Sequence, residues 1–69
     1  MRAVYSGRVA EFDDEVGRGE VEAAGMRFAF HCTAIADGTR SIAADTPVRF
    51  RLVVGPLGAL EAAGISPAA

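Results

Sequence analysis

The 69 residues suffice for one small domain, because two would leave about 35 residues each, too few for a core to hold either folded. Hydrophobic residues make up 51% of the chain, which excludes a disordered protein, and no apolar run approaches the ~20 residues that span a bilayer. All seven basic residues are arginine, nine acids outnumber them, and the net charge of -2 argues against a dedicated duplex binder, which needs a strongly basic surface.

The inventory of reactive side chains is small. Cys32 is the single cysteine and His31 the single histidine, so the chain provides neither a disulfide framework nor a zinc ligand set. It shows no pair of nucleophile and base, and we expect no enzyme. We also expect no cofactor, no metal, no small-molecule substrate and no membrane partner. The N-terminus has no apolar signal stretch, which predicts a cytoplasmic protein.

The first half of the chain predicts three strands. The first covers residues 3 to about 12, with Val9 pointing inward. A short second strand covers residues 20–22. The dipeptide Ala24-Gly25 provides a tight turn into a third strand at residues 26–32. Alternation along that third strand puts its two phenylalanines and Cys32 inward, as core residues.

The second half predicts two more strands. The run Val48-Arg49-Phe50-Arg51-Leu52 alternates apolar and basic side chains, which is typical of a half-buried strand, and this strand extends to residue 54. A glycine- and proline-containing turn at residues 55–58 leads to a last strand at 59–65. In the connection at residues 33–46 we expect a short helical turn at 33–35, and we expect Ile35 and Ile42 to lie within reach of the core.

Five short strands in so few residues indicate a small closed or nearly closed barrel, because open sheet edges invite aggregation. The predicted domain covers residues 1–66, with a short C-terminal tail at 67–69. Its main core candidates are the inward apolar residues of the strands: Val9, Val21, Phe28, Phe30, Val48, Phe50 and Leu52.

Three runs of the chain resemble the bacterial cold-shock domain. They lie at residues 7–13, 17–21 and 28–35, and the turn at 55–59 with the alanines that follow resembles the closing segment of that family. The resemblance covers about residues 4–66. It implies an all-β fold, a five-stranded antiparallel OB-fold barrel, and it implies binding of single-stranded RNA or DNA. In that family, bases stack on a row of exposed aromatic rings framed by a few cations.

The stacking rings are the part of the family pattern that this chain lacks. The first signature run, of the type Lys-Gly-Phe-Gly-Phe-Ile, reads Val16-Gly17-Arg18-Gly19-Glu20-Val21 here, and both aromatics are gone. The second, of the type Val-Phe-Val-His-Phe, reads Phe28-Ala29-Phe30-His31-Cys32. A Trp and the Lys before it are replaced by Glu11 and Ala10. Each stacked base contributes ~1–3 kcal/mol, so the remaining affinity is expected to be low.

The resemblance leaves four candidate nucleic-acid-binding residues. Phe12, His31 and a cation at Arg8 match the family's set, and the guanidinium of Arg18 replaces a ring on which a base would stack. For three of the four there is an ordinary structural alternative. Phe12 is a candidate for the rim of the core, His31 for a plain strand residue, and Arg18 for a surface ion pair with Glu20 or Glu11.

Two functions remain open at this point. The leading prediction is a cold-shock-like module that binds single-stranded RNA or DNA weakly or in an altered mode. The alternative is a barrel that has lost nucleic-acid binding and serves as a protein–protein interaction or self-association module. The replacement of rings by Arg and Glu favours the alternative, because charged residues suit salt-bridged contacts. A fold alone does not decide between these two functions.

Overall fold

The computed structural model describes residues 3–68, and it contains five strands and one short helix. The elements are β1 (Tyr5–Asp13), β2 (Arg18–Ala23), β3 (Met26–His31), the 3-10 helix η1 (Cys32–Ala34), β4 (Pro47–Val54) and β5 (Leu60–Pro67). No helix within residues 3–68 is long and apolar enough to cross a membrane.

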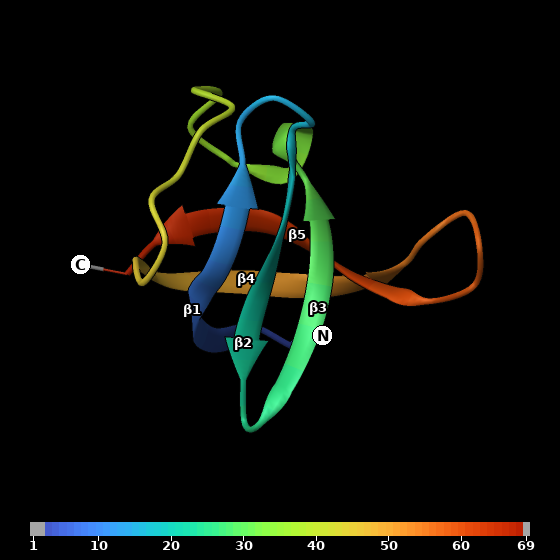
Figure 1. Cartoon of the computed structure of the whole chain (residues 1–69). Coiled ribbons are helices and arrows are strands. Elements are labelled where there is room, and N and C mark those ends of the chain that lie inside the picture. The colour runs from blue at the N-terminus through green and yellow to red at the C-terminus, as the bar shows by residue number, and fades with distance from the viewer. Residues whose placement is uncertain (1–2, 69) are drawn as a thin grey trace.

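The strands close into a barrel in the order β1-β2-β3-β5-β4. In Figure 1, β1, β2 and β3 lie side by side, and β4 and β5 cross behind them. This confirms the predicted all-β class and five-stranded, OB-fold-like barrel. One closure differs from the expectation of an antiparallel barrel, because β3 and β5 run parallel where Ala29 faces Glu61. These two strands are not consecutive in the chain. The long connection between β3 and β4 (the 3–4 connection), which begins with η1, carries the chain across the barrel to β4, and β5 follows β4.

Two irregularities bend the sheet into a closed shape. The pairing of β1 with β2 shifts register between Val9 and Glu11, and the pairing of β4 with β5 shifts between Arg49 and Arg51. Bulges of this kind bend the strand and increase its local twist, and β1 pairs with β2 on one side and with β4 on the other. Gly7 is required at the bend of β1, because a Cβ there would collide with the carbonyl oxygen of Glu22.

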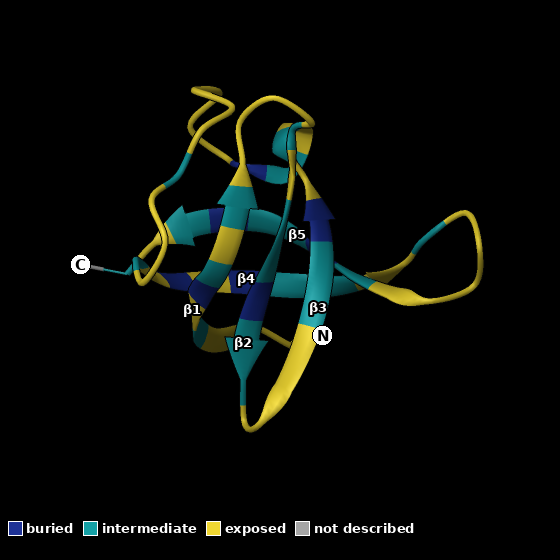
Figure 2. Ribbon diagram, in the orientation of Figure 1, coloured by how far each residue is buried: buried dark blue, intermediate teal, exposed yellow. Residues whose placement is uncertain are grey.

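The core lies inside the barrel and is entirely apolar (Figure 2). Alternation along β1, β2, β3 and β4 turns apolar side chains inward, as predicted. Phe28 and Leu52, expected in the core, are half-buried and pack against it, as does Ile42. Within residues 3–68 the buried hydrophobic residues are Val9, Val21, Phe30, Ile35, Val48, Phe50, Ala62 and Ile65.

The last strand continues beyond its predicted end. β5 extends to Pro67, because Ser66 and Pro67 face Arg49 and Val48 of β4. The amide of Ala68 also donates a hydrogen bond to the carbonyl of Pro47. The strand pairing therefore reaches into the predicted tail at 67–69, past the predicted domain end at residue 66, and residue 69 lies outside the described residues.

Candidate nucleic-acid interface

The candidate interface is the outer face of β1, β2 and β3. Every second residue of these strands points out of the barrel, and strand pairing arranges the outward residues in three cross-strand rows. The rows, written from β1 to β3, are Asp13–Arg18–His31, Glu11–Glu20–Ala29 and Arg8–Glu22–Arg27. The row Arg8–Glu22–Arg27 alternates in sign, whereas Glu11 stands directly opposite Glu20, and no Phe, Tyr or Trp side chain stands in any of the three rows.

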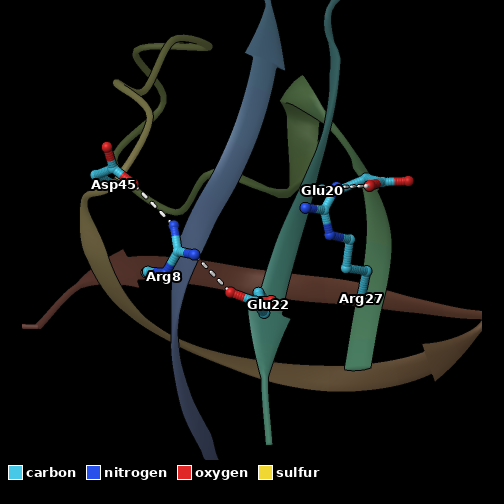
Figure 3. Close-up of polar contacts among 5 residues, drawn as sticks. All are labelled: Arg8, Glu20, Glu22, Arg27 and Asp45. Atoms are coloured by element: carbon cyan, nitrogen blue, oxygen red, sulfur yellow. Dashed lines mark hydrogen bonds and ion pairs between the residues drawn. The ribbon is translucent and has the colours of Figure 1, made fainter. Parts of the chain in front are cut away.

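Arg8 is held by two acids at one end of this face (Figure 3). Its Nη2 lies 2.7 Å from Oε1 of Glu22, and its Nη1 lies 2.8 Å from Oδ1 of Asp45 in the 3–4 connection. Asp45 has a positive φ of 69° and its amide donates to the carbonyl of Val9, so the loop backbone is fixed where it meets Arg8. The predicted phosphate contact at Arg8 would require breaking both ion pairs.

A third ion pair crosses the face diagonally. The Nη1 of Arg27 on β3 lies 3.3 Å from Oε1 of Glu20 on β2. Both side chains are largely exposed, so the pair contributes little to stability, about 0–1 kcal/mol. It does occupy Glu20, which the sequence suggested as a partner for Arg18. Arg27 is therefore ion-paired with Glu20, and Arg18 has no ion-pair partner among residues 3–68.

Arg18 lies in the first row, at the start of β2. It is exposed, its cross-strand neighbours are Asp13 and His31, and its guanidinium makes no ion pair or hydrogen bond with any of residues 3–68. A free guanidinium can stack on a base and donate to a phosphate at the same time. Of the predicted site residues, Arg18 and His31 are the two that the fold places directly opposite each other.

His31 is exposed, and its ring is oriented by the start of η1. The Thr33 backbone N–H donates to Nδ1 over 3.3 Å, and the Thr33 hydroxyl lies 3.1 Å from the same nitrogen. A nitrogen that accepts from an N–H carries no proton, so the neutral ring carries its proton on Nε2. This leaves Nε2–H free to act as a donor on the strand position opposite Arg18. Sequence reasoning missed Thr33 as the residue that orients the ring, because alternation continued the strand through Cys32.

The position of Cys32 corrects a sequence prediction. Strand β3 ends at His31, and Cys32 opens η1 instead of pointing into the core opposite His31. Its Sγ lies 3.7 Å from Nδ1 of His31, on the same side. The amide of Cys32 donates to the carbonyl of Gly17, and a Cβ at Gly17 would lie 3.0 Å from Sγ. This contact joins the β1–β2 turn to the end of β3, beside the Arg18 and His31 pair.

Phe12 belongs to the rim of the core. Its ring stacks on that of Phe30, with centroids 5.7 Å apart and planes 7° from parallel. Because the ring packs against the buried cluster, it does not stand on the outer face where a base would stack. Of the two interpretations that the sequence allowed for Phe12, the structure gives the core rim, and the residue is not included in the site proposed below.

Two acids of the β1–β2 turn accept hydrogen bonds that stabilise the turn and link it to the 3–4 connection. Oδ1 of Asp13 accepts from the amides of Glu15 and Val16, and Oδ1 of Asp14 accepts from the hydroxyl of Ser41 in the 3–4 connection.

In that connection the backbone N–H of Thr39, and then its hydroxyl, lower the pKa of Asp37. Within residues 3–68 no group of three or more potential ligands is placed to hold a metal ion.

Two comparisons with known proteins add no further identification. No protein-family model matches the chain, and no curated protein matches it.

Proposed function

We propose that this protein is a cold-shock-like module that binds single-stranded RNA or DNA weakly, through Arg18 and His31 on the outer face of β2 and β3. One observation carries the proposal: Arg18, which has no ion-pair partner among residues 3–68, lies directly opposite His31, whose Nδ1 accepts from the Thr33 amide. In OB-fold barrels the face of strands 2 and 3, with the loops between strands 1 and 2 and between 4 and 5, is the usual oligonucleotide surface.

The chemistry of the pair suits a phosphate next to a base. Arg18 supplies a planar cation for the phosphate or for a base face, and Nε2–H of His31 supplies a second donor. Arg18 is the one arginine that we assign to the phosphate contact. The logarithm of the binding constant should therefore fall with the logarithm of salt concentration at a slope of about -0.7, the value for one phosphate of a single strand.

The affinity should be low for two reasons. The three rows carry no Phe, Tyr or Trp ring on which a base could stack, and each stacked base contributes ~1–3 kcal/mol in proteins that have such rings. The acids Glu11, Glu20 and Glu22 stand on the same face and repel phosphates. We expect a dissociation constant between about 10 µM and about 1 mM, since 1 mM corresponds to roughly 4 kcal/mol of binding free energy.

The proposal is tested by fluorescence anisotropy with labelled oligo-dT and a mixed-sequence RNA at low salt. Arg18→Ala should weaken binding by at least about tenfold, because hydrogen bonds to charged groups contribute ~1.5–3 kcal/mol. The matched control is Arg49→Ala, which removes an equally exposed arginine on β4, away from this face. It should change the affinity less than twofold.

The outcomes separate the function from the site. No binding of either oligonucleotide up to about 1 mM protein would overturn the function, since weaker contacts fall below 4 kcal/mol. Equal losses in Arg18→Ala and Arg49→Ala would show a general charge effect and overturn the site. His31→Ala should also weaken binding. Its thermal unfolding is measured in parallel, because that change also removes the acceptor at the start of η1.

A further inference from the structure

Among residues 3–68, the last four residues of β4 have a strand partner on one side only. Within residues 3–68, β1 meets β4 only from the Tyr5–Phe50 pair to the Arg8–Pro47 pair, so residues 51–54 are paired on the β5 side alone. In Figure 1 the β4–β5 connection projects away from the rest of the barrel. An open edge offers a row of backbone groups to which another strand can add.

The backbone groups at this edge belong to Leu52 and Val54. The N–H of Gly55 donates to the carbonyl of Ala59 across the ribbon, over 2.8 Å, so Gly55 points its backbone groups toward β5. Successive residues of a strand point these groups to opposite sides. Val53 therefore also points toward β5, and Leu52 and Val54 present their N–H and C=O groups to the open side.

The side chains of the ribbon are apolar and exposed. Val54 is 72% exposed, Leu57 97%, Leu60 49% and Val53 41%, and residues 52–60 contain no charged side chain. Natural sheet edges are ordinarily protected from pairing by a charge, a proline or a bulge within the edge. Residues 52–54 have neither a charge nor a proline, and the ribbon is therefore suited to pairing with an equally uncharged strand.

We propose that this edge is a self-association surface, on which β4 of a second copy pairs antiparallel about a two-fold axis through Val53. Leu52 of one protomer then faces Val54 of its partner, and the two symmetric pairs exchange four backbone hydrogen bonds. The proposal is independent of the nucleic-acid function, because it uses none of the residues of that site.

The neighbouring registers are disfavoured by the residues they would bring together. An axis through Leu52 would set Val54 opposite Phe50, whose edge already pairs with Tyr5 of β1. An axis through Val54 would set Leu52 opposite Pro56, which has no N–H to donate. Only the axis through Val53 satisfies the backbone groups of both Leu52 and Val54.

A second copy also fits the charges of this edge. In the proposed register Arg51 faces Gly55 of the partner, and the two copies of Arg51 stand four residue steps apart, about 13 Å, beyond the screening length of about 10 Å at 0.1 M salt. The pairing is closed, so it yields a dimer and not a fibre. Four residues of edge make a small interface, and we expect a weak dimer.

Sedimentation equilibrium between about 10 µM and about 1 mM protein measures this association. The mean mass should rise with concentration toward that of a dimer. Val53→Lys places two cations opposite each other on the axis and should raise the dissociation constant more than tenfold. Val16→Lys is the matched control, since Val16 is 62% exposed in the β1–β2 turn, and it should leave the constant unchanged. A monomer throughout the range, or equal effects of the two variants, would overturn the proposal.

Disulfide trapping tests the register itself. In a Cys32→Ser background, Val53→Cys should cross-link readily, because residues opposite each other in such a non-hydrogen-bonded pair have Cα atoms about 4.5 Å apart, within disulfide range. Val54→Cys is the control: it is the more exposed position, but it faces Leu52 of the partner and should cross-link at least tenfold more slowly. If Val54→Cys cross-links as fast as Val53→Cys, the register is wrong and the proposal fails with it.

Discussion

On the proposed function, adding two aromatic rings to the middle row of the outer face should greatly strengthen the binding of single-stranded nucleic acid. Glu20 and Ala29 are direct cross-strand partners on β2 and β3, and both point out of the barrel. Replacing both by phenylalanine puts two rings side by side, with Cβ atoms ~4.5–5.5 Å apart. Arg18 and His31 lie in the adjacent row and would frame the rings.

The magnitude follows from stacking. Each ring should contribute ~1–3 kcal/mol with a base stacked on it, so two rings should tighten binding between about 30-fold and about 10⁴-fold. The change also breaks the 3.3 Å pair between Glu20 and Arg27, which costs about 0–1 kcal/mol of folding stability at such exposure. Arg27 is then free to contact phosphate, which adds to binding and steepens its salt dependence.

The measurement is fluorescence anisotropy with labelled oligo-dT, on Glu20→Phe with Ala29→Phe. The control pairs Glu20→Leu with Ala29→Leu, which removes the same charge and adds apolar surface without a ring. If the phenylalanine variant binds no more tightly than the leucine variant, these two positions are not base platforms. The assignment of this face as the one that lost its aromatics would then be wrong.

Two further predictions concern the fold. Gly7→Ala should destabilise the protein by ~1–3 kcal/mol, lowering Tm by about 4–8 °C per kcal/mol in thermal unfolding, because its Cβ would collide with the backbone oxygen of Glu22. Gly55→Ala should have a smaller effect, since its Cβ meets only the flexible carboxylate of Glu61, and equal losses would contradict the packing argument. The Asp37 carboxylate, whose pKa is lowered by the Thr39 amide and hydroxyl, should contribute stability above the ordinary aspartate value of 3.8 and lose it as pH falls through the lowered pKa. NMR titration of its carboxyl carbon should give a midpoint below that value, closer to it in Thr39→Ala, and a midpoint at or above it would refute the assignment.

Local patterns in the sequence identified most of the barrel wall. Val48, Phe50 and their alternating arginines determine one strand, since side chains of a strand alternate between its faces whatever lies beside it. The same rule placed Val9, Val21 and Phe30 in the core, where the structure has them. It gave little sign of the full length of β2, because Val21 is its only large apolar residue. Pairing along both edges extends that strand to Arg18 and Ala23.

The candidate site shows the same division. His31 and Arg18 were selected from the sequence, by resemblance, but the partners of the other charges were not. Arg8 bonds to Asp45, which lies 37 residues away, and Arg27 takes the carboxylate of Glu20 diagonally across two strands. Neither contact has a local pattern in the sequence, because both depend on strand register. The register is also what leaves Arg18 without a partner among residues 3–68.

By itself the sequence determined that this protein has five strands, which residues face inward along most of them, and that the outward face carries charges where rings would be needed for stacking. Tertiary structure alone decided the parallel closure of β3 against β5, the core positions of Ala62 and Ile65, the contact of His31 with Thr33 at the start of η1, and, among residues 3–68, the one-sided pairing of the end of β4. Alternation is a property of one strand and can be recognised locally. Closure, register and ion pairing arise between segments far apart in the chain, so they depend on how all five strands fit around one core.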